Sequence, residues 1–307
     1  MMSPPKRTAL VTGATGFIGS HLSRHLHVEG WNVAVVTRGE TDISVLGDFA
    51  DRLDMHRHDG TTEGMSAIMN TARPDVVFHL ASLFLSDHRP DQVDPLIRSN
   101  ILFGTQLLEA MTGAGVRLLV NTGTGWQHFK QRQYDPVNLY AATKQAFEDI
   151  LRYYVESRSV QAITLKLFDT YGPGDRRRKI FTLLREASGR DESLAMSPGE
   201  QQIDLVYIDD VLSAFLEAAK RLLAGEAGKH ESYVVTSGAP IVLRDLVDTY
   251  LRVTGRHVTV RWGGKPYRHR EVMSPWNTGK PLPGWRPTVA LEEGILRMES
   301  PGGGSRS

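Results

Sequence analysis

A tyrosine and a lysine four residues apart, Tyr140 and Lys144, are the pair in this sequence best suited to acid–base chemistry. They open a helical pattern over residues 138–156, where the i, i+4 spacing puts both side chains on one helix face. A free tyrosine has a pKa of about 10 and exchanges protons poorly at neutral pH. A nearby ammonium favours the phenolate and lowers that pKa, so the pair can pass a proton to or from an alcohol or ketone. The same spacing occurs by chance at surfaces, so the pair alone does not establish an active site.

Residues 13–19, Gly-Ala-Thr-Gly-Phe-Ile-Gly, could hold a dinucleotide. The strand-like residues 9–12 precede them and an amphipathic helical pattern follows. Gly13 allows a sharp turn, Gly16 lets the backbone approach a pyrophosphate, and Gly19 lets the helix pack closely on the strand. The helix N-terminus adds free N–H groups and a partial positive charge. No lysine follows the last glycine, which excludes an ATPase-type phosphate loop. A purely structural turn is the alternative.

Composition is that of an ordinary globular protein, with 307 residues, 40% hydrophobic and 23% charged. The formal net charge of +1 gives no indication of nucleic acid or an anionic membrane as a partner. The sequence has no cysteine, which excludes disulfides and thiolate chemistry and agrees with a reducing cytoplasm. We see no signal peptide and no apolar run long enough to span a bilayer, and we expect a cytoplasmic protein.

Histidines give no convincing metal site. His21 and His25 are four apart on a helix, as metal-binding pairs can be, but no third ligand is apparent. His79 ends an apolar strand and is expected to be a hydrogen-bonded core residue. We therefore predict no metal.

Strands and helices alternate through the first 168 residues. We expect strands at 9–12, 32–37, 53–58, 75–80, 116–121 and 161–168. We expect helices at 17–28, 63–72, 91–113 and 138–156, and a polar loop with at most a short helix at 38–50. This alternation predicts an α/β fold with a doubly wound parallel sheet of the Rossmann type and right-handed crossovers.

The C-terminal part is less regular. We expect helices at 179–188, 209–223 (with Asp209 as N-cap) and 243–254, and strands at 202–207, 233–236 and 258–261. Residues 262–288 are predicted to form an irregular pocket wall. The expected domains are a dinucleotide-binding domain at 1–168 with returning segments at 201–225, a smaller α/β substrate-binding domain at 169–200 and 226–298, and a disordered tail at 299–307.

The motifs together resemble the extended short-chain dehydrogenase/reductases, the NAD-dependent epimerase/dehydratase family. The resemblance covers about residues 7–298. Its marks are GATGFIG (13–19), FHLAS (78–82), Asn100 in RSNILFGT, YAATK (140–144), YGPGD (171–175) and VYIDD (206–210).

The resemblance implies a role for each matching residue. Tyr140 is the acid–base residue, and Lys144 binds the nicotinamide ribose and tunes Tyr140. The third catalytic member is a Ser or Thr, for which Thr124 is our first choice and Thr122 the second, because an ungapped count lands on Gly123. Cofactor contacts are implied for Gly13, Thr15, Gly16, Phe17, Ile18, Gly19, Arg38, Asp59, Gly60, Leu80, Ala81, Ser82, Asn100, Thr122, Tyr140, Lys144 and Phe168. Of these, Asn100 is expected to act structurally and Asp59 to approach the adenine.

Three segments of the sequence are similar to the nucleotide-diphospho-4-keto-6-deoxyhexose reductases of the abequose synthase type. The matching segments are 121–129, 165–181 and 266–285. The Asp-Glu pair of the sugar 4,6-dehydratases is absent after Thr124. The implied reaction is reduction of a sugar C4 ketone. The alternatives are an NAD-retaining nucleotide-sugar 4-epimerase and a non-catalytic dinucleotide-sensing protein.

The residue after the second strand bears on the choice of nicotinamide. An acid there binds the ribose 2′-hydroxyl of NAD, whereas Arg38 accommodates the 2′-phosphate of NADP. Arg38 thus favours NADP(H), and Glu40 keeps NAD(H) possible.

A nucleotide-diphospho-sugar is the implied substrate. The residues expected to contact it are Trp126, Gln127, His128, Arg178, Lys179 and Arg268. The resemblance also implies a homodimer formed through 91–113 and 138–156.

Overall fold

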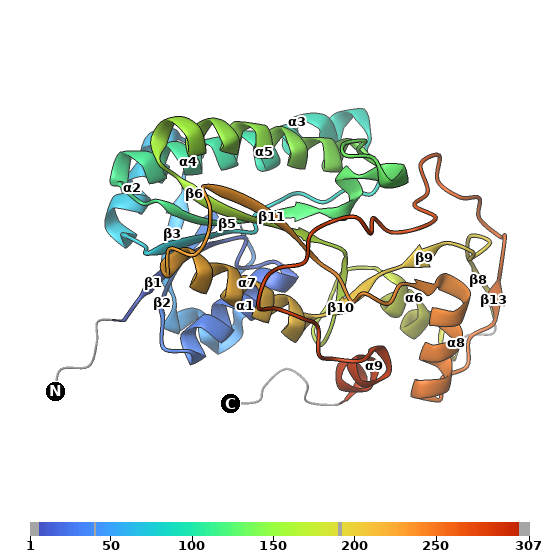
Figure 1. The fold of residues 1–307 in the computed structure, drawn as a ribbon. Helices are drawn as coiled ribbons and strands as arrows, with labels where there is room; N and C mark the ends of the chain where they lie inside the picture. Colours follow the sequence, from blue (N-terminus) through green and yellow to red (C-terminus); the bar gives the residue numbers. More distant parts are fainter. Residues whose placement is uncertain (1–5, 40, 190–191, 301–307) are drawn as a thin grey trace.

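The computed structural model describes residues 6–39, 41–189 and 192–300. Seven strands form the central sheet: β1 (Thr8–Thr12), β2 (Asn32–Arg38), β3 (Asp54–His58), β4 (Val76–His79), β5 (Leu118–Thr124), β6 (Gln161–Leu167) and β11 (His230–Val235). Their hydrogen-bonded order is β3-β2-β1-β4-β5-β6-β11, and every pair is parallel (Figure 1). The sequence-based prediction of a Rossmann-type sheet is confirmed, and the carboxyl ends of its strands share one edge.

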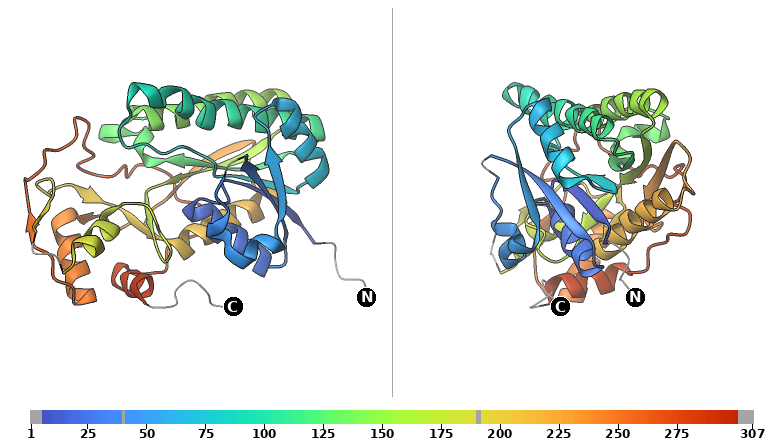
Figure 2. Two further views of the ribbon diagram at one scale, coloured as in Figure 1. Left: turned by 180° about the vertical axis from the view of Figure 1, so that it is seen from behind. Right: turned by 90° about the vertical axis from the view of Figure 1, so that its left-hand side faces the viewer.

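Helices cover both faces of this sheet. On one face lie α2 (Thr62–Ala72), α4 (Phe103–Ala114) and α5 (Leu139–Arg158), and on the other lie α1 (Phe17–Val28) and α7 (Ile208–Leu223). Seen from behind and from the side, the two layers stay on opposite faces (Figure 2). Each layer has its own apolar core, because the strands are buried on both faces and alternate residues point to different layers.

The approach to α4 is nearly continuous helix. It consists of η2 (Pro90–Gln92), α3 (Val93–Ile97) and a π-helical turn η3 (Arg98–Leu102). The expected loop at 38–50 contains the 3-10 segment η1 (Ser44–Arg52). Two short 3-10 turns, η4 (Gly125–Gln127) and η5 (Phe129–Gln131), follow β5.

Smaller elements form the rest of the molecule. They are three two-stranded sheets, pairing β7 (Asp169–Tyr171) with β10 (Leu205–Tyr207), β8 (Leu194–Ala195) with β13 (Val260–Arg261) and β9 (Gln202–Ile203) with β12 (Ile241–Val242), and the helices α6 (Ile180–Ala187), α8 (Leu243–Thr254) and α9 (Leu291–Glu299). Residues 262–288 have no helix or strand and run back towards the central sheet (Figure 1). In the parts of the chain described here, no helix has the length and apolar character needed to cross a bilayer.

Three local expectations need correction. The expected strand at 202–207 is split at Asp204, because this buried carboxylate turns aside to accept hydrogen bonds from the Ser237 N–H (2.8 Å) and the Thr236 hydroxyl. Tyr207, not Asp209, is the N-cap of α7, and Asp209 lies in the first turn. Glu299, expected in a disordered tail, ends α9 and binds Arg185 and Arg256; the tail residues 301–307 lie outside the described residues.

Candidate active site

The glycine segment forms a tight backbone cradle between β1 and α1. Gly13 has a φ of +73°, and a Cβ there would lie 2.7 Å from the backbone nitrogen of Ala81. A Cβ on Gly19 would collide with the carbonyl oxygen of Gly13. Gly16, the N-cap of α1, has no side chain to cap the helix, so backbone N–H groups stay available at this end. The cradle fits a phosphate group, which such N–H groups bind.

Thr12 joins this cradle to the neighbouring strand. Its hydroxyl accepts hydrogen bonds from the N–H groups of Leu80 (3.2 Å) and Ala81 (3.1 Å) and contacts Nδ1 of His79 at 2.9 Å. His79 is therefore the hydrogen-bonded core residue that its strand position predicts. Burial lowers the pKa of His79 to about 3, so it is neutral at physiological pH.

Asn100 connects the segment after β4 to helix α5. It lies in the π-helical turn, where its Oδ1 accepts from the Leu83 N–H (2.7 Å) and its Nδ2 donates to the Leu83 carbonyl and to Oγ1 of Thr143, both at 3.0 Å. The Ser82 hydroxyl also donates to Asn100 at 3.3 Å. Asn100 is 2% exposed, so its amide is used in holding this loop beside the residue that precedes Lys144.

Tyr140 and Lys144 lie in the first two turns of α5, which Asn138 caps by accepting the Ala141 N–H. Burial raises the pKa of Tyr140 to about 12, against the opposing effects of the Ser82 hydroxyl and the charge of Arg177. The expectation that the nearby Lys144 lowers this pKa is therefore wrong, because burial has the larger effect. Burial lowers the pKa of Lys144 to about 8, against the charge of Glu148. At neutral pH the phenol therefore carries its proton and is ready to act as a proton donor.

The two candidate threonines have different hydrogen-bond partners. Oγ1 of Thr124 accepts from the Trp126 N–H at 3.2 Å and caps η4. Oγ1 of Thr122 is buried and has no hydrogen-bond partner among the described residues. A buried polar group without a partner is costly and usually marks a missing ligand or a functional role. Of the two hydroxyls, that of Thr122 is without any hydrogen-bond partner among the described residues, whereas that of Thr124 accepts one hydrogen bond and still has its proton to donate.

A cavity of about 740 Å³ lies at the carboxyl end of β2. It is lined by Thr15, Arg38, Gly39, Thr41, Asp42, Val45 and Arg176. Arg38 comes from the end of β2, whereas Arg176 comes from the segment after β7. Glu40, which was weighed against Arg38, lies outside the described residues. Two arginines at one cavity are suited to binding a phosphate.

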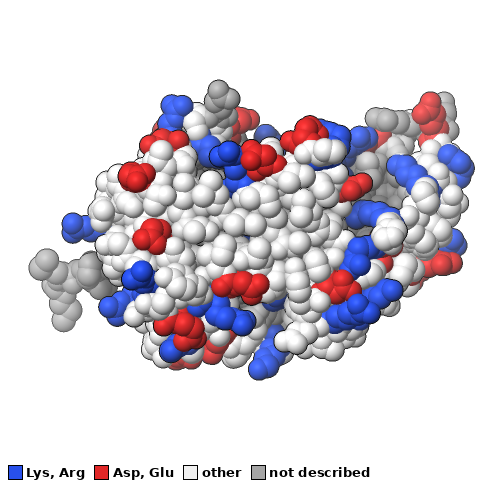
Figure 3. All heavy atoms as spheres, turned by 90° about the horizontal axis from the view of Figure 1, so that it is seen from above, with Lys and Arg blue, Asp and Glu red and all other residues white. Residues whose placement is uncertain are grey.

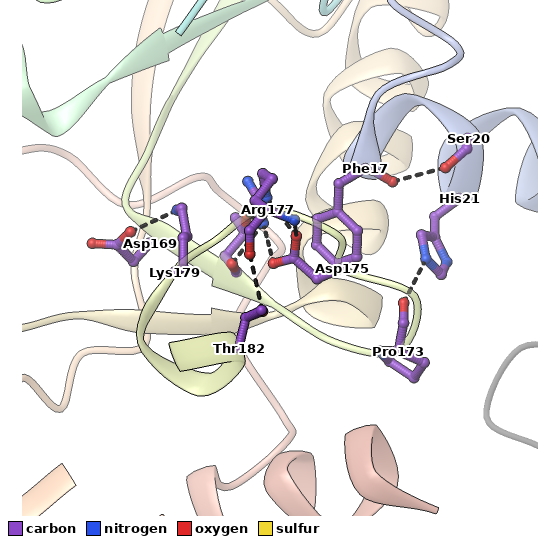
Figure 4. Close-up of polar contacts among 10 residues, drawn as sticks. Phe17, Ser20, His21, Asp169, Pro173, Asp175, Arg177, Lys179 and Thr182 are labelled. Atoms are coloured by element: carbon purple, nitrogen blue, oxygen red, sulfur yellow. Dashed lines mark hydrogen bonds and ion pairs between the residues drawn. The ribbon is translucent and has the colours of Figure 1, made fainter. Parts of the chain in front are cut away.

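Charged residues after β7 crowd against the glycine segment (Figure 4). Nε of Arg177 is 2.7 Å from Oδ1 of Asp175, its Nη2 donates to the Thr170 carbonyl (2.9 Å), and its guanidinium lies 4.5 Å from the centre of the Phe17 ring. His21 contacts the Pro173 carbonyl at 3.1 Å. These contacts hold the segment that begins the second half of the molecule against α1.

Lys179 and Arg268 lie near one acidic residue, Asp169. Nζ of Lys179 is 2.7 Å from Oδ1 of Asp169 (Figure 4). Burial alone would raise the pKa of Asp169, but the charges of Lys179, Arg177 and Arg268 lower it. The cluster has more positive than negative groups and can accept an anionic ligand. Arg178, by contrast, pairs with Glu186 and is 73% exposed.

Aromatic residues lie around Tyr140 and the turn that follows β5. The ring of Phe84 lies 5.0 Å from that of Tyr140 and 5.6 Å from that of Trp126. The guanidinium of Arg268 is 5.9 Å from the Trp126 ring, and His128 stacks on Trp276 with their centres 3.6 Å apart. The contacts of Arg268 and Trp276 place the segment 262–288 against the turn that follows β5.

Gln127 does not face a ligand, contrary to its predicted contact with the substrate. Its side chain is fully buried, and its amide is bonded to Thr124, Gln145 and Glu148. The substrate contact was expected from the position of Gln127 just after Thr124, and that position does not reveal which way the side chain points.

The other predicted cofactor residues occupy supporting positions. Asp59 accepts from the Thr61 N–H and hydroxyl, both at 2.8 Å, and the Gly60 carbonyl accepts from Gln106. The Phe168 ring packs so closely on Gly125 that a Cβ there would be 2.7 Å away. Ile18 and Leu80 pack on the main core.

Sequence reasoning missed several residues at this site. Arg176 was not among the predicted cofactor residues, Trp276 was included only in the pocket wall at 262–288, and Phe84 and Glu148 were not predicted at all. The helical spacing Tyr140, Lys144, Glu148 was the signal available for Glu148.

The sequence profile of a known family, described as the NAD dependent epimerase/dehydratase family, matches residues 9–235. The chain belongs to this family. The sequence-based identification of an enzyme of the extended short-chain dehydrogenase/reductase type is thereby confirmed.

Two relatives of different activity are about equally similar to the chain. CDP-abequose synthase of Salmonella muenchen is 25% identical over 294 residues, covering 95% of this chain and 96% of its own length. UDP-glucose 4-epimerase of Mycolicibacterium smegmatis is 26% identical, covering 94% of this chain and 96% of its own length.

Solved structures of the family share the fold over nearly the whole chain. UDP-glucose 4-epimerase of Thermotoga maritima, determined with UDP-glucose, superposes with a TM-score of 0.81 at 25% identity, covering 95% of this chain and 97% of that one. UDP-glucose 4-epimerase of Thermus thermophilus, determined with NAD, gives a TM-score of 0.76 at 26% identity, covering 94% and 96%.

Proposed function

We propose that this protein is an NADPH-dependent reductase that converts the C4 ketone of a nucleotide-diphospho-4-keto-6-deoxy sugar to an alcohol. The observation that carries the proposal is the cavity at the end of β2 that Arg38 and Arg176 both line. A site for a 2′-phosphate indicates NADP(H). The similarity to CDP-abequose synthase supports a reduction.

The nicotinamide cofactor, when bound, supplies the hydride. Tyr140, protonated at neutral pH, donates the proton to the carbonyl oxygen, and Lys144 holds the ribose and stabilises the phenolate that remains. We assign the hydroxyl that orients the carbonyl to Thr122 in place of Thr124. The support for this change is that Oγ1 of Thr122 has no partner among the described residues, whereas that of Thr124 caps a turn.

The substrate's diphosphate fits the cluster of Arg177, Lys179 and Arg268 around Asp169. Anions bind where cations outnumber acids, and an incoming diphosphate can replace Asp169 as the partner of Lys179. Phe84 and Trp126, beside Tyr140, form an apolar surface on which the sugar ring can lie.

A homodimer through α4 and α5 is also part of the proposal. The face that these helices form has a broad uncharged area (Figure 3). Exposed apolar side chains on and beside it include Leu102 (42% exposed) and Tyr153 (56% exposed). Uncharged exposed surface of this kind marks interfaces. The cytoplasmic location and the domain boundaries stay predictions.

The test is to supply nucleotide-linked 4-keto-6-deoxyhexoses and follow the absorbance of NADPH together with NMR of the sugar. We expect one NADPH consumed per sugar and a single C4 epimer. The chain is about equally similar to a UDP-glucose 4-epimerase, so epimerisation is the competing function. An epimerase would interconvert two 4-hydroxy sugars with no net change in cofactor. That outcome would refute the reductase.

A further inference from the structure

A buried ion pair lies between β6 and α5, next to the turn that follows β5. Nζ of Lys166, on β6, is 3.3 Å from Oε2 of Glu148, on α5, and the two side chains are only 6% and 9% exposed. Removing two charges from water costs free energy that their attraction often fails to recover, and an apolar pair of similar size is frequently more stable. Stability alone therefore does not account for charges at this point between sheet and helix.

Glu148 is connected to the end of β5 through Gln127. Oε1 of Glu148 accepts from Nε2 of Gln127 at 2.9 Å, and Oε1 of Gln127 accepts from the backbone N–H of Thr124 at 3.0 Å. A Cβ on Gly123 would lie 2.9 Å from the same Glu148 oxygen. Because side chains alternate along a strand, Glu148 holds the strand end from the face opposite to Thr122 and Thr124.

Glu148 also lies one helical turn beyond Lys144, on the same face of α5. Both side chains are buried, and the negative charge of Glu148 opposes the burial that lowers the pKa of Lys144. The ammonium of Lys144 in turn adds to the effect of burial in lowering the pKa of His79, on β4, which is neutral. The groups around Glu148 and its partner Lys166 are His128, His230 and Asp149, and burial lowers the pKa of both histidines.

We propose that Glu148 is a positioning residue for both halves of the catalytic site: through Gln127 it fixes the strand end that presents Thr122, and through its charge it supports the ammonium of Lys144. Lys166 makes this arrangement possible by neutralising Glu148 from the sheet side. The inference rests on the proposed function, because it concerns the same catalytic residues.

The hydrogen-bond link is tested with Gln127→Leu, which removes the amide and leaves the ion pair intact. We expect kcat to fall about ten- to hundred-fold, since a small misplacement of a catalytic group can have this effect. The Kd for NADPH should be unchanged, because Lys144 is untouched. Unchanged kcat in a folded Gln127→Leu protein contradicts the positioning role.

The charge effect is tested with the double variant Glu148→Gln/Lys166→Met. Glu148→Gln alone would leave Lys166 buried and unpaired, whereas the double variant buries no net charge. The readout is the Kd of NADPH from pH 6.5 to 10 without any sugar, with folding checked by thermal melting. We expect the pH above which binding weakens to move down by about one pH unit relative to wild type. The matched control is Glu156→Gln/Lys229→Met, which removes an exposed ion pair between the same helix and the residue before β11, where Nζ and Oε2 are 2.9 Å apart.

The outcomes separate this inference from the proposed function. The role of Glu148 is supported if the pH at which NADPH binding weakens is lower in the double variant Glu148→Gln/Lys166→Met, while the wild type and the control variant share the same value. Equal midpoints in all three proteins overturn that role and leave the reductase standing. A wild-type protein that binds neither NADPH nor NADH overturns the proposed function and this inference together.

Discussion

Removing the two arginines at the cavity beyond β2 should abolish the preference for NADPH. Arg38 and Arg176 come from segments far apart in the sequence but line one cavity with Thr15, Thr41 and Asp42. The variants are Arg38→Ala, Arg176→Ala and the double variant. NADH, which lacks the 2′-phosphate, should bind all four proteins with similar affinity.

The magnitude follows from the kind of contact. A hydrogen bond to a charged group contributes roughly 1.5–3 kcal/mol, which corresponds to about a ten- to hundred-fold change in Kd. Each single variant should weaken NADPH binding by that factor. The two losses should not add fully, because both arginines would act on one phosphate.

Asp42, which lines the same cavity, should influence how strongly Arg176→Ala weakens NADPH binding. The charge of Arg176 contributes to the lowered pKa of Asp42, after hydrogen bonds from Ser44. Without Arg176, this carboxylate would repel the 2′-phosphate, so Arg176→Ala should be more damaging than Arg176→Ala combined with Asp42→Asn. The loss of NADPH affinity in each of these two variants should be smaller in high salt, because salt screens exposed charges.

The assay is fluorescence titration of each protein with NADPH and with NADH. Arg89→Ala is the matched control, since Arg89 pairs with Asp91 on an exposed loop and does not line the cavity. Equal affinity of the wild type for the two cofactors would falsify the 2′-phosphate assignment. A preference for NADPH that survives in the double variant would require other residues to bind this phosphate.

Other predictions concern the reacting groups. Tyr140→Phe should lower kcat roughly 10²–10⁴-fold with little change in the Kd of NADPH, because it removes only the proton donor; steady-state kinetics beside cofactor titration would show whether turnover survives. Thr122→Val should reduce kcat/KM more than Thr124→Val, and the reverse order would return the catalytic role to Thr124. The rate should fall above about pH 8, because burial lowers the pKa of Lys144 to about 8 and the ammonium form is present below that value; a flat kcat/KM profile from pH 7 to 10 would contradict this.

Regular structure was predictable where hydrophobic periodicity extends over several residues. The helix at 243–254 was predicted with the bounds of α8, and the strand at 9–12 began one residue later than β1. The strands β8 and β12 were not predicted, because they contain two residues each, too few to show any periodicity. Helix α9 was missed because it is short, and its N-cap, Ala290, carries no capping side chain.

The candidate site was predictable only as far as local motifs extend. The glycine cradle and the pair formed by Tyr140 and Lys144 each occupy a few neighbouring residues. Gln127 is buried by partners 18 and 21 residues away, and His128 stacks on Trp276 across the molecule. Such contacts depend on the completed fold, and no spacing in the sequence records them.

The turn after β5 depends on residues much later in the chain. Lys130 and Gln131 adopt left-handed backbone conformations, with φ of 54° and 62°. The side chain of Gln131 donates to the Pro275 carbonyl (2.9 Å) and accepts from the Asn277 N–H (3.0 Å). A ribosome would have to add 146 further residues after Gln131 before Asn277 exists. The ribosome therefore makes the glycine cradle and Tyr140 well before the segment that holds the turn after β5, so this wall of the candidate site is added late in synthesis.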